Sequence, residues 1–353
     1  MPEGWQIYIK TEEIWEKMLE DIEAAQKSID LEQYSFWDDR AGHKFLKLLY
    51  KKHQQGVKVR ILVDGYGSYP LFTSSFVSQM IDSGVQIAKY NPPSIFRPTS
   101  WFYHCHKKTL VVDSTIGWLG GIGIKKKFTG FRDTMLRMNG EIVKDIERSF
   151  ESLWTDTNRK NYFGYSKFER KSEDFKLLIN HAGFGPKEIY EEMRAQIQNA
   201  KKSIYLTTAY FFPDRNFFQL LLDAAKRGVE IKMILRGKDD EFLPVRFSSS
   251  YFLKALKANI QIFRYDSAII HAKTAIVDNE WATMGSSNLD KFSFYYNIEA
   301  NLSSRNTEFV SAIREQFLND LQHCRQIQLK DWYRRSLVER IIEVLVWPIH
   351  NYL

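Results

Sequence analysis

The pattern of hydrophobic and polar positions predicts the same series of helices and strands twice along the chain. In each copy, a stretch with helical periodicity ends near a serine, Ser28 in the first copy and Ser203 in the second. A short β-rich run comes next, at 29–36 and at 204–212. Because strands alternate with helices in both copies, the pattern predicts a largely parallel sheet covered by helices.

Each copy continues with a second helix, which Gly56 or Gly228 closes at its C-terminal cap position. A buried strand follows, predicted over 57–63 and over 229–235, and then a further helix and strand. The offset between the copies changes little, from 203 − 28 = 175 to 271 − 106 = 165. We therefore interpret the chain as a fused duplication.

The duplication predicts two α/β domains, 1–160 and 161–353, related by a pseudo-twofold axis. The boundary falls in the polar, turn-rich segment around 155–187. We expect mostly parallel or mixed sheets with helices on both faces, and one active site at the interface of the two domains.

Composition indicates a folded protein that meets anionic partners. Hydrophobic residues make up 44% and aromatic residues 15% of the chain, which excludes general disorder. The formal charge of +7 suits phospholipid surfaces and nucleic acids, and charge alone does not choose between them. Cys105 and Cys324 are too few and too far apart for a disulfide framework, which indicates a reducing compartment.

Membrane contact, if it exists, is expected to be peripheral. The N-terminus lacks the order of charges and apolar residues of a secretory signal. The longest apolar stretch, at 341–349, is interrupted by Glu343 and is shorter than the roughly 20 residues that a spanning helix needs. We therefore expect a cytoplasmic protein that is peripheral on a membrane.

The same short motif follows the last predicted strand of each copy. It has the form H-x-K-x-x-x-x-D and consists of His106, Lys108 and Asp113 in the first copy, and of His271, Lys273 and Asp278 in the second. A glycine follows each histidine at the same distance, 120 − 106 = 14 and 285 − 271 = 14. If the motif is a strand, its period of two puts the histidine and the lysine on one face.

Two such motifs brought together can perform phosphodiester transfer. One imidazole attacks phosphorus, a second protonates the leaving oxygen, and the lysines neutralise the non-bridging oxygens. Neither a metal nor another cofactor is needed, since the cations are already in the protein. His104, Cys105 and His106 raise a metal-site alternative, but strand alternation sends Cys105 away from the histidines, and the sequence offers no second ligand cluster.

The paired motifs resemble the signature of the phospholipase D superfamily, in which each H-x-K-x-x-x-x-D is followed by G-[GS]-x-N. Within it, the chain is most similar to bacterial cardiolipin synthases, on GSSNLD at 285–290, YYNIEANLSS at 295–304 and FRDTMLRMNG at 131–140. The resemblance covers nearly the whole chain. It implies that the two halves are phospholipase D-like αβ domains.

The resemblance also implies a role for each site residue. His106 would be the nucleophile that forms a phosphohistidine, and His271 the general acid and later the base, although near-symmetry leaves the reverse order open. Lys108 and Lys273 would bind phosphate oxygens. Further hydrogen bonds would come from Asn288 and from the backbone near Gly121 and Ser286.

A nucleophilic histidine needs an acceptor on its other ring nitrogen, which fixes the tautomer and raises the basicity. Asp133 lies 27 residues after His106, and Glu299 lies 28 residues after His271. Superfamily members place an acidic residue in this position, so both are candidate orienting acids. Asp113 and Asp278 complete the catalytic motif, and we expect them to act structurally by ordering the turn after the strand.

The chain departs from the cardiolipin synthase pattern at one site position. Residue 123 is glycine where these synthases typically carry an asparagine, the counterpart of Asn288 (123 − 106 = 17; 288 − 271 = 17). One phosphate contact is lost or replaced. This departure puts the identity of the substrate in doubt more than the class of reaction. We also expect no membrane-spanning N-terminal hairpin of the kind that some of these synthases have.

Three segments are candidates for contact with lipid, each with a plainer alternative. Residues 330–353 have the charges and apolar stripe of an interfacial helix, or form a last helix packed on the core. Residues 91–103 form one lip of the active-site entrance and hold acyl chains, or pack into the core through Phe96 and Trp101. Lys125 to Lys127 touch headgroups, or belong to a solvated loop.

Three functions follow from these patterns. The first is transfer of a phosphatidyl group from a glycerophospholipid to an alcohol, or its hydrolysis to phosphatidic acid. The second is a nuclease or other phosphodiesterase, although superfamily nucleases are often single-motif chains that dimerise. The third is a catalytically silent lipid-binding protein, which the intact motifs disfavour. We expect a phospholipid substrate, no nucleic-acid partner and no obligate protein partner.

Overall fold

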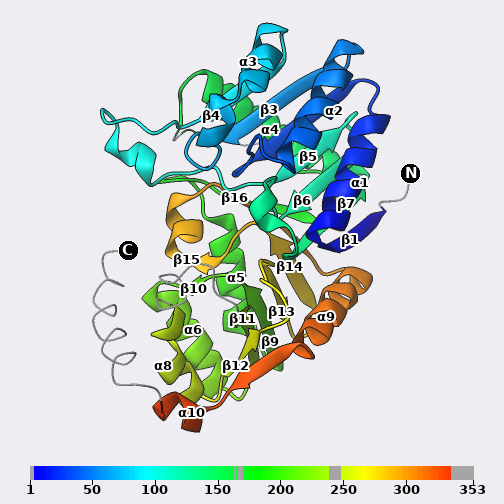
Figure 1. Cartoon of the computed structure of the whole chain (residues 1–353). Helices are drawn as coiled ribbons and strands as arrows, with labels where there is room; N and C mark the ends of the chain where they lie inside the picture. The colour runs from blue at the N-terminus through cyan, green and yellow to red at the C-terminus, as the bar shows by residue number, and fades with distance from the viewer. Residues whose placement is uncertain (1–3, 163, 165–169, 238–247, 335–353) are drawn as a thin grey trace.

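The chain folds into two halves of similar build that are stacked one on the other (Figure 1). The computed structural model describes residues 4–162, 164, 170–237 and 248–334. Each half contains one large mixed sheet with helices on both faces. The predicted fold class is therefore confirmed.

The first sheet has seven strands in the order β1-β7-β6-β5-β2-β3-β4. Strands β2, β3 and β4 are parallel, whereas β5, β6, β7 and β1 continue the sheet in antiparallel fashion. The strands are β1 (Trp5–Lys10), β2 (Ser28–Gln33), β3 (Lys58–Asp64), β4 (Gln86–Tyr90), β5 (Thr109–Val112), β6 (Ile116–Gly120) and β7 (Arg132–Asn139).

Alternation along these strands fills two separate cores. Ile61 of β3 faces the three helices that precede the motif, whereas the next residue, Leu62, faces the opposite layer with Phe150. The helices of this half are α1 (Thr11–Ala24), α2 (Gly42–Gln54) and α3 (Ser75–Asp82) on one face and α4 (Glu141–Asn158) on the other.

The second sheet has eight strands in the order β17-β12-β11-β9-β13-β14-β16-β8. They are β8 (Lys176–Asn180), β9 (Ser203–Thr208), β11 (Glu230–Arg236), β12 (Gln261–Tyr265), β13 (Thr274–Val277), β14 (Trp281–Gly285), β16 (Glu299–Ser304) and β17 (Cys324–Ile327). Its helices are α5 (Glu188–Asn199), α6 (Arg215–Lys226), α8 (Phe252–Lys257), α9 (Thr307–Leu321) and α10 (Leu329–Tyr333), and a short two-stranded sheet pairs β10 (Phe211–Phe212) with β15 (Leu289–Asp290).

The two sheets repeat one topology, as the sequence pattern predicts. The order β7-β6-β5-β2-β3-β4 in the first half corresponds to β16-β14-β13-β9-β11-β12 in the second. Gly56 and Gly228 end equivalent helices at the same φ of +88°, a conformation that side chains other than glycine rarely adopt. The two halves thus agree in strand order and also in the backbone conformation of this turn, as expected if the sequence arose by duplication.

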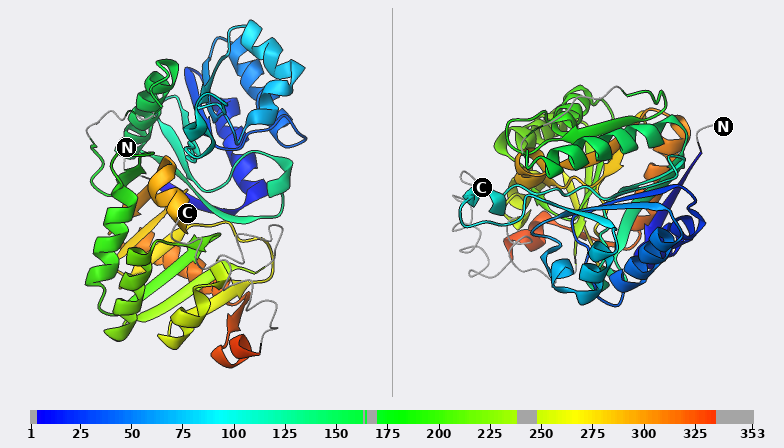
Figure 2. Two further views of the ribbon diagram at one scale, coloured as in Figure 1. Left: turned by 90° about the vertical axis from the view of Figure 1, so that its left-hand side faces the viewer. Right: turned by 90° about the horizontal axis from the view of Figure 1, so that it is seen from above.

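A continuous apolar core joins the halves. It contains Phe150 of α4 from the first half together with Phe309, Ile313 and Phe317 of α9 from the second, all nearly inaccessible to solvent. The left view of Figure 2 shows the two halves stacked closely one on the other. Burial of this kind favours a fixed relative placement of the halves, which a shared site requires.

The predicted domain boundary at residue 160 lies between α4, which ends at Asn158, and β8, which begins at Lys176; the boundary itself stays a prediction. The proposed interfacial helix at 330–353 lies largely outside the described residues, and within its described part Trp332 packs against Phe252 with ring centroids 5.0 Å apart. In the described ranges, no helix is long and apolar enough to cross a membrane.

Candidate active site

The histidine and lysine of each motif lie in extended backbone just before a strand. The prediction places them within the strand. Strands β5 and β13 each begin one residue after the motif lysine. The predicted alternation nevertheless holds, because His106 and Lys108 line a common pocket while Lys107 between them turns away. The Nζ atom of Lys107 lies 3.1 Å from Glu32 Oε2 on the other side of the strand.

Each motif histidine is bound to an acid from the opposite half of the chain. His106 Nδ1 lies 2.9 and 3.0 Å from the two carboxylate oxygens of Glu299. His271 Nδ1 lies 2.6 Å from Asp133 Oδ2. Both predicted orienting acids therefore contact a histidine, but the matched spacing within each half, which pairs His106 with Asp133, does not describe the pairs that form.

Backbone hydrogen bonds between the halves explain this exchange. The N–H of His106 donates to the carbonyl of Ile298 at 2.8 Å, and Ile298 directly precedes Glu299. In the same way, the N–H of His271 donates to the carbonyl of Arg132 at 2.7 Å, and Arg132 directly precedes Asp133. Each motif segment thus pairs with the strand of the other half that carries the acid.

The contacts of the two rings fix their protonation. Because Nδ1 of each histidine donates to a carboxylate, Nε2 keeps its lone pair. Burial lowers the pKa of His106, and the charge of Glu299 opposes this only in part. Burial and then the charge of Lys273 lower the pKa of His271 to about 3. Both imidazoles are therefore neutral at neutral pH, which is the form that attacks phosphorus.

The two motif lysines are buried beside the histidines. Lys108 Nζ donates to the carbonyl of His106 at 2.5 Å, and burial lowers its pKa to about 7. Lys273 Nζ donates to the carbonyl of His271, and burial lowers its pKa to about 8. Only Lys108 reaches the pocket wall, whereas Lys273 lies 3.0 Å from His271 Nδ1, behind the ring.

The backbone N–H groups of Gly121 and Ser286, near which the sequence suggests phosphate contacts, are both used in hydrogen bonds within the protein. The N–H of Gly121 donates to Thr134 at 3.3 Å, and the N–H of Ser286 donates to Ala300 at 3.0 Å. Both groups therefore belong to hydrogen bonds between neighbouring strands. A sheet hydrogen bond uses the single donor that each residue has, so phosphate binding by the backbone near these two residues stays a prediction.

Gly121 and Ser286 support the orienting acids instead. The hydroxyl of Ser286 donates to Glu299 Oε2 at 2.5 Å. At the equivalent position, a β-carbon added to Gly121 would stand 2.3 Å from Asp133 Oδ1, so glycine is required for the close approach of this carboxylate. Both residues thus determine where a carboxylate lies, and through it how a histidine is oriented.

Asn288 lines the pocket as expected, whereas Gly123 leaves no room for a matching asparagine. Asn288 is buried, and its Oδ1 atom has no hydrogen-bond partner among the described residues. The side-chain amide can therefore form a hydrogen bond with a ligand. A β-carbon on Gly123 would lie 2.8 Å from the carbonyl oxygen of Ser35. The backbone of Ser35 thus lies too close for a side chain at position 123.

The motif aspartates Asp113 and Asp278 lie outside the pocket, at the far ends of β5 and β13. Asp113 accepts three hydrogen bonds of 2.7–2.8 Å from the backbone N–H groups of residues 26–28. Asp278 accepts three of 2.7–2.9 Å from residues 201–203. These contacts support the structural role expected for the two aspartates, and a part in catalysis stays a prediction.

Removing either aspartate is therefore expected to weaken folding more than catalysis. Asp113→Ala or Asp278→Ala leaves three backbone donors without their acceptor, and we expect a loss of about 1–3 kcal/mol in the free energy of unfolding. Denaturant titration measures this loss. The turnover per folded molecule should stay near that of the parent protein, and a large fall in it at full folding would contradict the structural role.

The same carboxylates predict a pH dependence. Partial burial acts to raise their pKa, but the three backbone donors outweigh it and hold each pKa below its usual value. A depressed folded-state pKa stabilises the protein above the unfolded value of about 4, and this stabilisation is lost as the pH falls through the folded value. The difference between parent and variant should therefore shrink below about pH 4.

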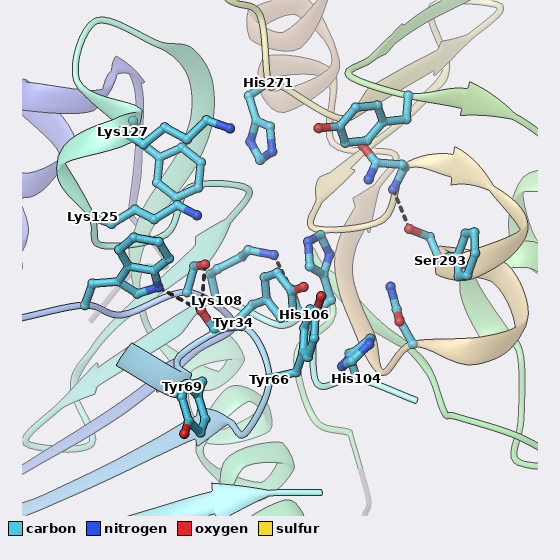
Figure 3. Close-up of a pocket in the computed structure, with 18 of the residues that line it drawn as sticks. Tyr34, Tyr66, Tyr69, His104, His106, Lys108, Lys125, Lys127, His271 and Ser293 are labelled. Carbon is cyan, nitrogen blue, oxygen red and sulfur yellow. Dashed lines mark hydrogen bonds between the residues drawn. The ribbon is translucent and has the colours of Figure 1, made fainter. Parts of the chain in front are cut away.

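The site opens into a pocket of about 920 Å³ that both halves line. Figure 3 shows His106 and His271 on opposite sides of it, with Lys108 beside His106. Aromatic rings form much of the wall, and Tyr34 lies edge-on to His106 with ring centroids 4.8 Å apart. Two imidazoles and an ammonium group around one aromatic pocket can bind a phosphodiester and exchange its alcohol.

The sequence assigns no role to many of the pocket residues, among them Tyr34, Arg236 and Asp290. Burial raises the pKa of Asp290 to about 7, so this carboxyl changes charge near neutral pH. Its counterpart in the first copy is Lys125, at the same distance after the glycine (290 − 285 = 5; 125 − 120 = 5). Comparison of the two copies reveals the residues that they share. Functional residues that differ between the copies, such as this pair, are therefore not found in this way.

The contacts of Cys105 agree with the argument against a metal at 104–106. Its sulfur donates to Glu32 Oε1 at 3.2 Å, on the side of the segment opposite to the pocket. In the part of the chain that the structure describes, the His, Cys, Asp and Glu side chains form no group of three placed to hold a metal ion.

Comparison with known families identifies the same two regions as the duplication. The family model described as "Cardiolipin synthase, PLD-like domain" matches residues 18–154 and 193–321. These ranges contain both motifs and both orienting acids.

Relatives match over nearly the whole chain. A cardiolipin synthase of Halalkalibacterium halodurans is 30% identical over 91% of this chain and 67% of its own length, and one of a Geobacillus strain is 30% identical over 94% and 69%. The crystal structure of the phosphatidylserine synthase of Haemophilus influenzae has the same fold, with a TM-score of 0.79 at 14% identity over 99% of this chain and 93% of that one. The chain thus belongs to the cardiolipin synthase group of PLD-like domains within the phospholipase D superfamily.

Proposed function

We propose that the chain is a phosphatidyltransferase that acts on glycerophospholipids through a phosphohistidine, in the manner of a cardiolipin synthase. The observation that carries the proposal is the pair of neutral histidines, each held at Nδ1 by a carboxylate, that enter one pocket from two halves. The similarity to bacterial cardiolipin synthases supports a phospholipid as the substrate class.

In the first step, Nε2 of one histidine attacks phosphorus and the bond to the headgroup alcohol breaks. The family resemblance gives this role to His106, and His271 then donates a proton to the oxygen of the departing alcohol. Glu299 stabilises the positive charge that His106 acquires, and Lys108 lies where it can neutralise a non-bridging oxygen. To act as the acid, His271 takes up a second proton at Nε2 from solvent when the substrate binds, which the negative charge of the bound phosphodiester favours, and it returns this proton to solvent when the product leaves after the second step.

In the second step, the hydroxyl of an acceptor attacks the phosphorus of the phosphohistidine. His271 takes up the proton of that hydroxyl, the N–P bond breaks, and His106 returns to its neutral state. The products are the free headgroup alcohol from the first step and a new phosphodiester from the second. The aromatic wall of the pocket, including Tyr34, Trp37 and Phe128, supports an alcohol rather than water as the acceptor, because it limits the water near phosphorus.

The proposal includes a location. We place the protein on the cytoplasmic side of a membrane as a peripheral protein, since its substrates would be bilayer lipids. No protein partner is required by this scheme. Hydrolysis to phosphatidic acid is the second candidate, because the same intermediate reacts with water if water reaches it.

The test is incubation of purified protein, and of a His106→Ala variant, with phosphatidylglycerol vesicles, followed by separation of the products by mass. Cardiolipin and glycerol from the parent protein alone are the expected result. Phosphatidic acid alone would make the protein a phospholipase. If no lipid product forms and a single-stranded oligonucleotide is cleaved, the lipid proposal is wrong and a nuclease takes its place.

A further inference from the structure

Large apolar side chains gather at the mouth of the pocket, where they are exposed to solvent. Among the described residues, nine large hydrophobic side chains are exposed, and six of them belong to two neighbouring segments. We call these six the apolar rim: Tyr66, Tyr69, Ile95, Phe96, Trp101 and Phe102. The segments touch where the rings of Tyr66 and Trp101 approach to 6.1 Å between centroids.

The exposure of the rim is a property of an ordered loop. The polar groups of residues 91–103 bond inward, as shown by Ser100, which is fully buried and donates to the carbonyl of Arg97 at 2.6 Å. The guanidinium of Arg97 donates to Asn91 Oδ1 at 3.1 Å, and Asn91 Nδ2 donates to the carbonyl of Tyr103 at 2.9 Å. The loop therefore satisfies its polar groups within itself.

The apolar side chains of the same loop point the other way. Ile95 is 81% and Phe96 is 89% exposed, so core packing, the plainer alternative for this segment, does not apply to Phe96. A loop that pairs its polar groups inside and exposes Phe and Ile outside is unfavourable in water, because contiguous exposed apolar surface mostly marks a contact site. In Figure 1 this segment projects at the left, at the level where the halves meet.

The rim is continuous with the catalytic pocket. Tyr66, Tyr69, Ile95 and Trp101 also line that pocket, so a headgroup moving toward the histidines passes along them. Lys125 and Lys127 line the same pocket, and Figure 3 shows both side chains directed into it. Among the described lining residues, Asp290 is the single acid, which gives the pocket behind the rim a charge complementary to anionic lipid.

We propose that the apolar rim inserts into the interface of an anionic phospholipid bilayer and sets the pocket mouth against the headgroups. Tryptophan and tyrosine favour the headgroup level, and phenylalanine and isoleucine favour the acyl boundary just below it. The choice of a bilayer as the occupant rests on the proposed function. A protein partner or a second copy of this chain would be the alternative occupant.

The test measures binding without turnover. The full chain carrying His106→Ala is incubated with vesicles of phosphatidylcholine, with or without phosphatidylglycerol, and the bound fraction is measured by flotation. Phe96→Ser in this background is expected to lower the affinity for anionic vesicles at least about tenfold, and Phe96→Ser with Phe102→Ser more so. The matched control is Ile81→Ser, which changes an exposed residue of α3 outside the rim.

The outcomes separate this proposal from the proposed function, because inactive protein is used throughout. Loss of binding in the rim variants, with Ile81→Ser and the thermal unfolding of all variants unchanged, supports docking. Equal binding by the rim variants overturns it, and so does equal binding to neutral and anionic vesicles. If the parent binds no vesicles and the rim variants change its association state by light scattering, the rim is an interface between copies.

Discussion

A His106→Ala variant is expected to lose phosphodiester turnover by at least about a thousandfold, because it removes the atom that would bond to phosphorus. The initial rate on phosphatidylglycerol vesicles measures this loss. Folding should be retained, since the contacts removed are the hydrogen bond that Nδ1 shares between the two oxygens of Glu299 and the edge-on contact with Tyr34, and the ring lies at a pocket wall. A thermal unfolding curve close to that of the parent protein is the check.

A trapping experiment distinguishes the nucleophile from the acid. A phosphodiester with a p-nitrophenol leaving group needs little protonation, so a His271→Ala variant should still form the covalent adduct and then fail to release it. Quenching with denaturant at alkaline pH, where an N–P bond survives, and peptide mass analysis without acid should find the phosphoryl group on the peptide that contains His106. An adduct on His271 in the parent protein would reverse the two roles, and an adduct in neither would contradict covalent catalysis.

The second large effect is expected from the orienting acids, and its direction tests the exchange between the halves. Glu299→Gln should lower kcat about a hundredfold or more, because the ring of His106 loses the charge that stabilises it on attack. The charge of Glu299 acts to raise the pKa of His106, so its removal should lower that pKa further. Asp133→Asn should do the same to His271.

The measurement is the titration of each histidine by NMR in the parent protein and in both variants. Glu299→Gln should move the signal of His106 and leave that of His271 nearly in place, and Asp133→Asn should give the opposite result. If each acid instead moves the histidine of its own half, the pairing described above is wrong. Asp113→Ala serves as the control, because its carboxylate lies at the far end of β5 and should move neither signal.

Much of the fold follows from the sequence because a duplication doubles every signal. The helix that Gly56 closes and the strand after it recur at Gly228, and both are present in the structure at the predicted places. The four motif residues His106, Lys108, His271 and Lys273 also recur in register, and three of them line one pocket. Local periodicity and repetition are sufficient for this level of description.

The sequence is less informative where the two halves act on each other. Spacing along the chain suggests Asp133 for His106, whereas the backbone bond from His106 to Ile298 brings Glu299 there instead. No periodicity within one half contains that contact. The same reason accounts for Arg236 and Asp290, which lie in the pocket because the fold places them there and have no matching charge in the other copy.

The exchanged acids make each half incomplete in the other's absence. A chain divided near residue 160 would yield two fragments, each holding one histidine without its carboxylate, so activity should return only on mixing, as complementation. In evolutionary terms, a change at Glu299 is selected through its effect on His106, 193 positions earlier in the chain. Because the two halves are covalently fused, such partners are inherited together. Each half then needs to fit only the other half of the same chain, so equivalent positions can carry different residues, as Lys125 and Asp290 do.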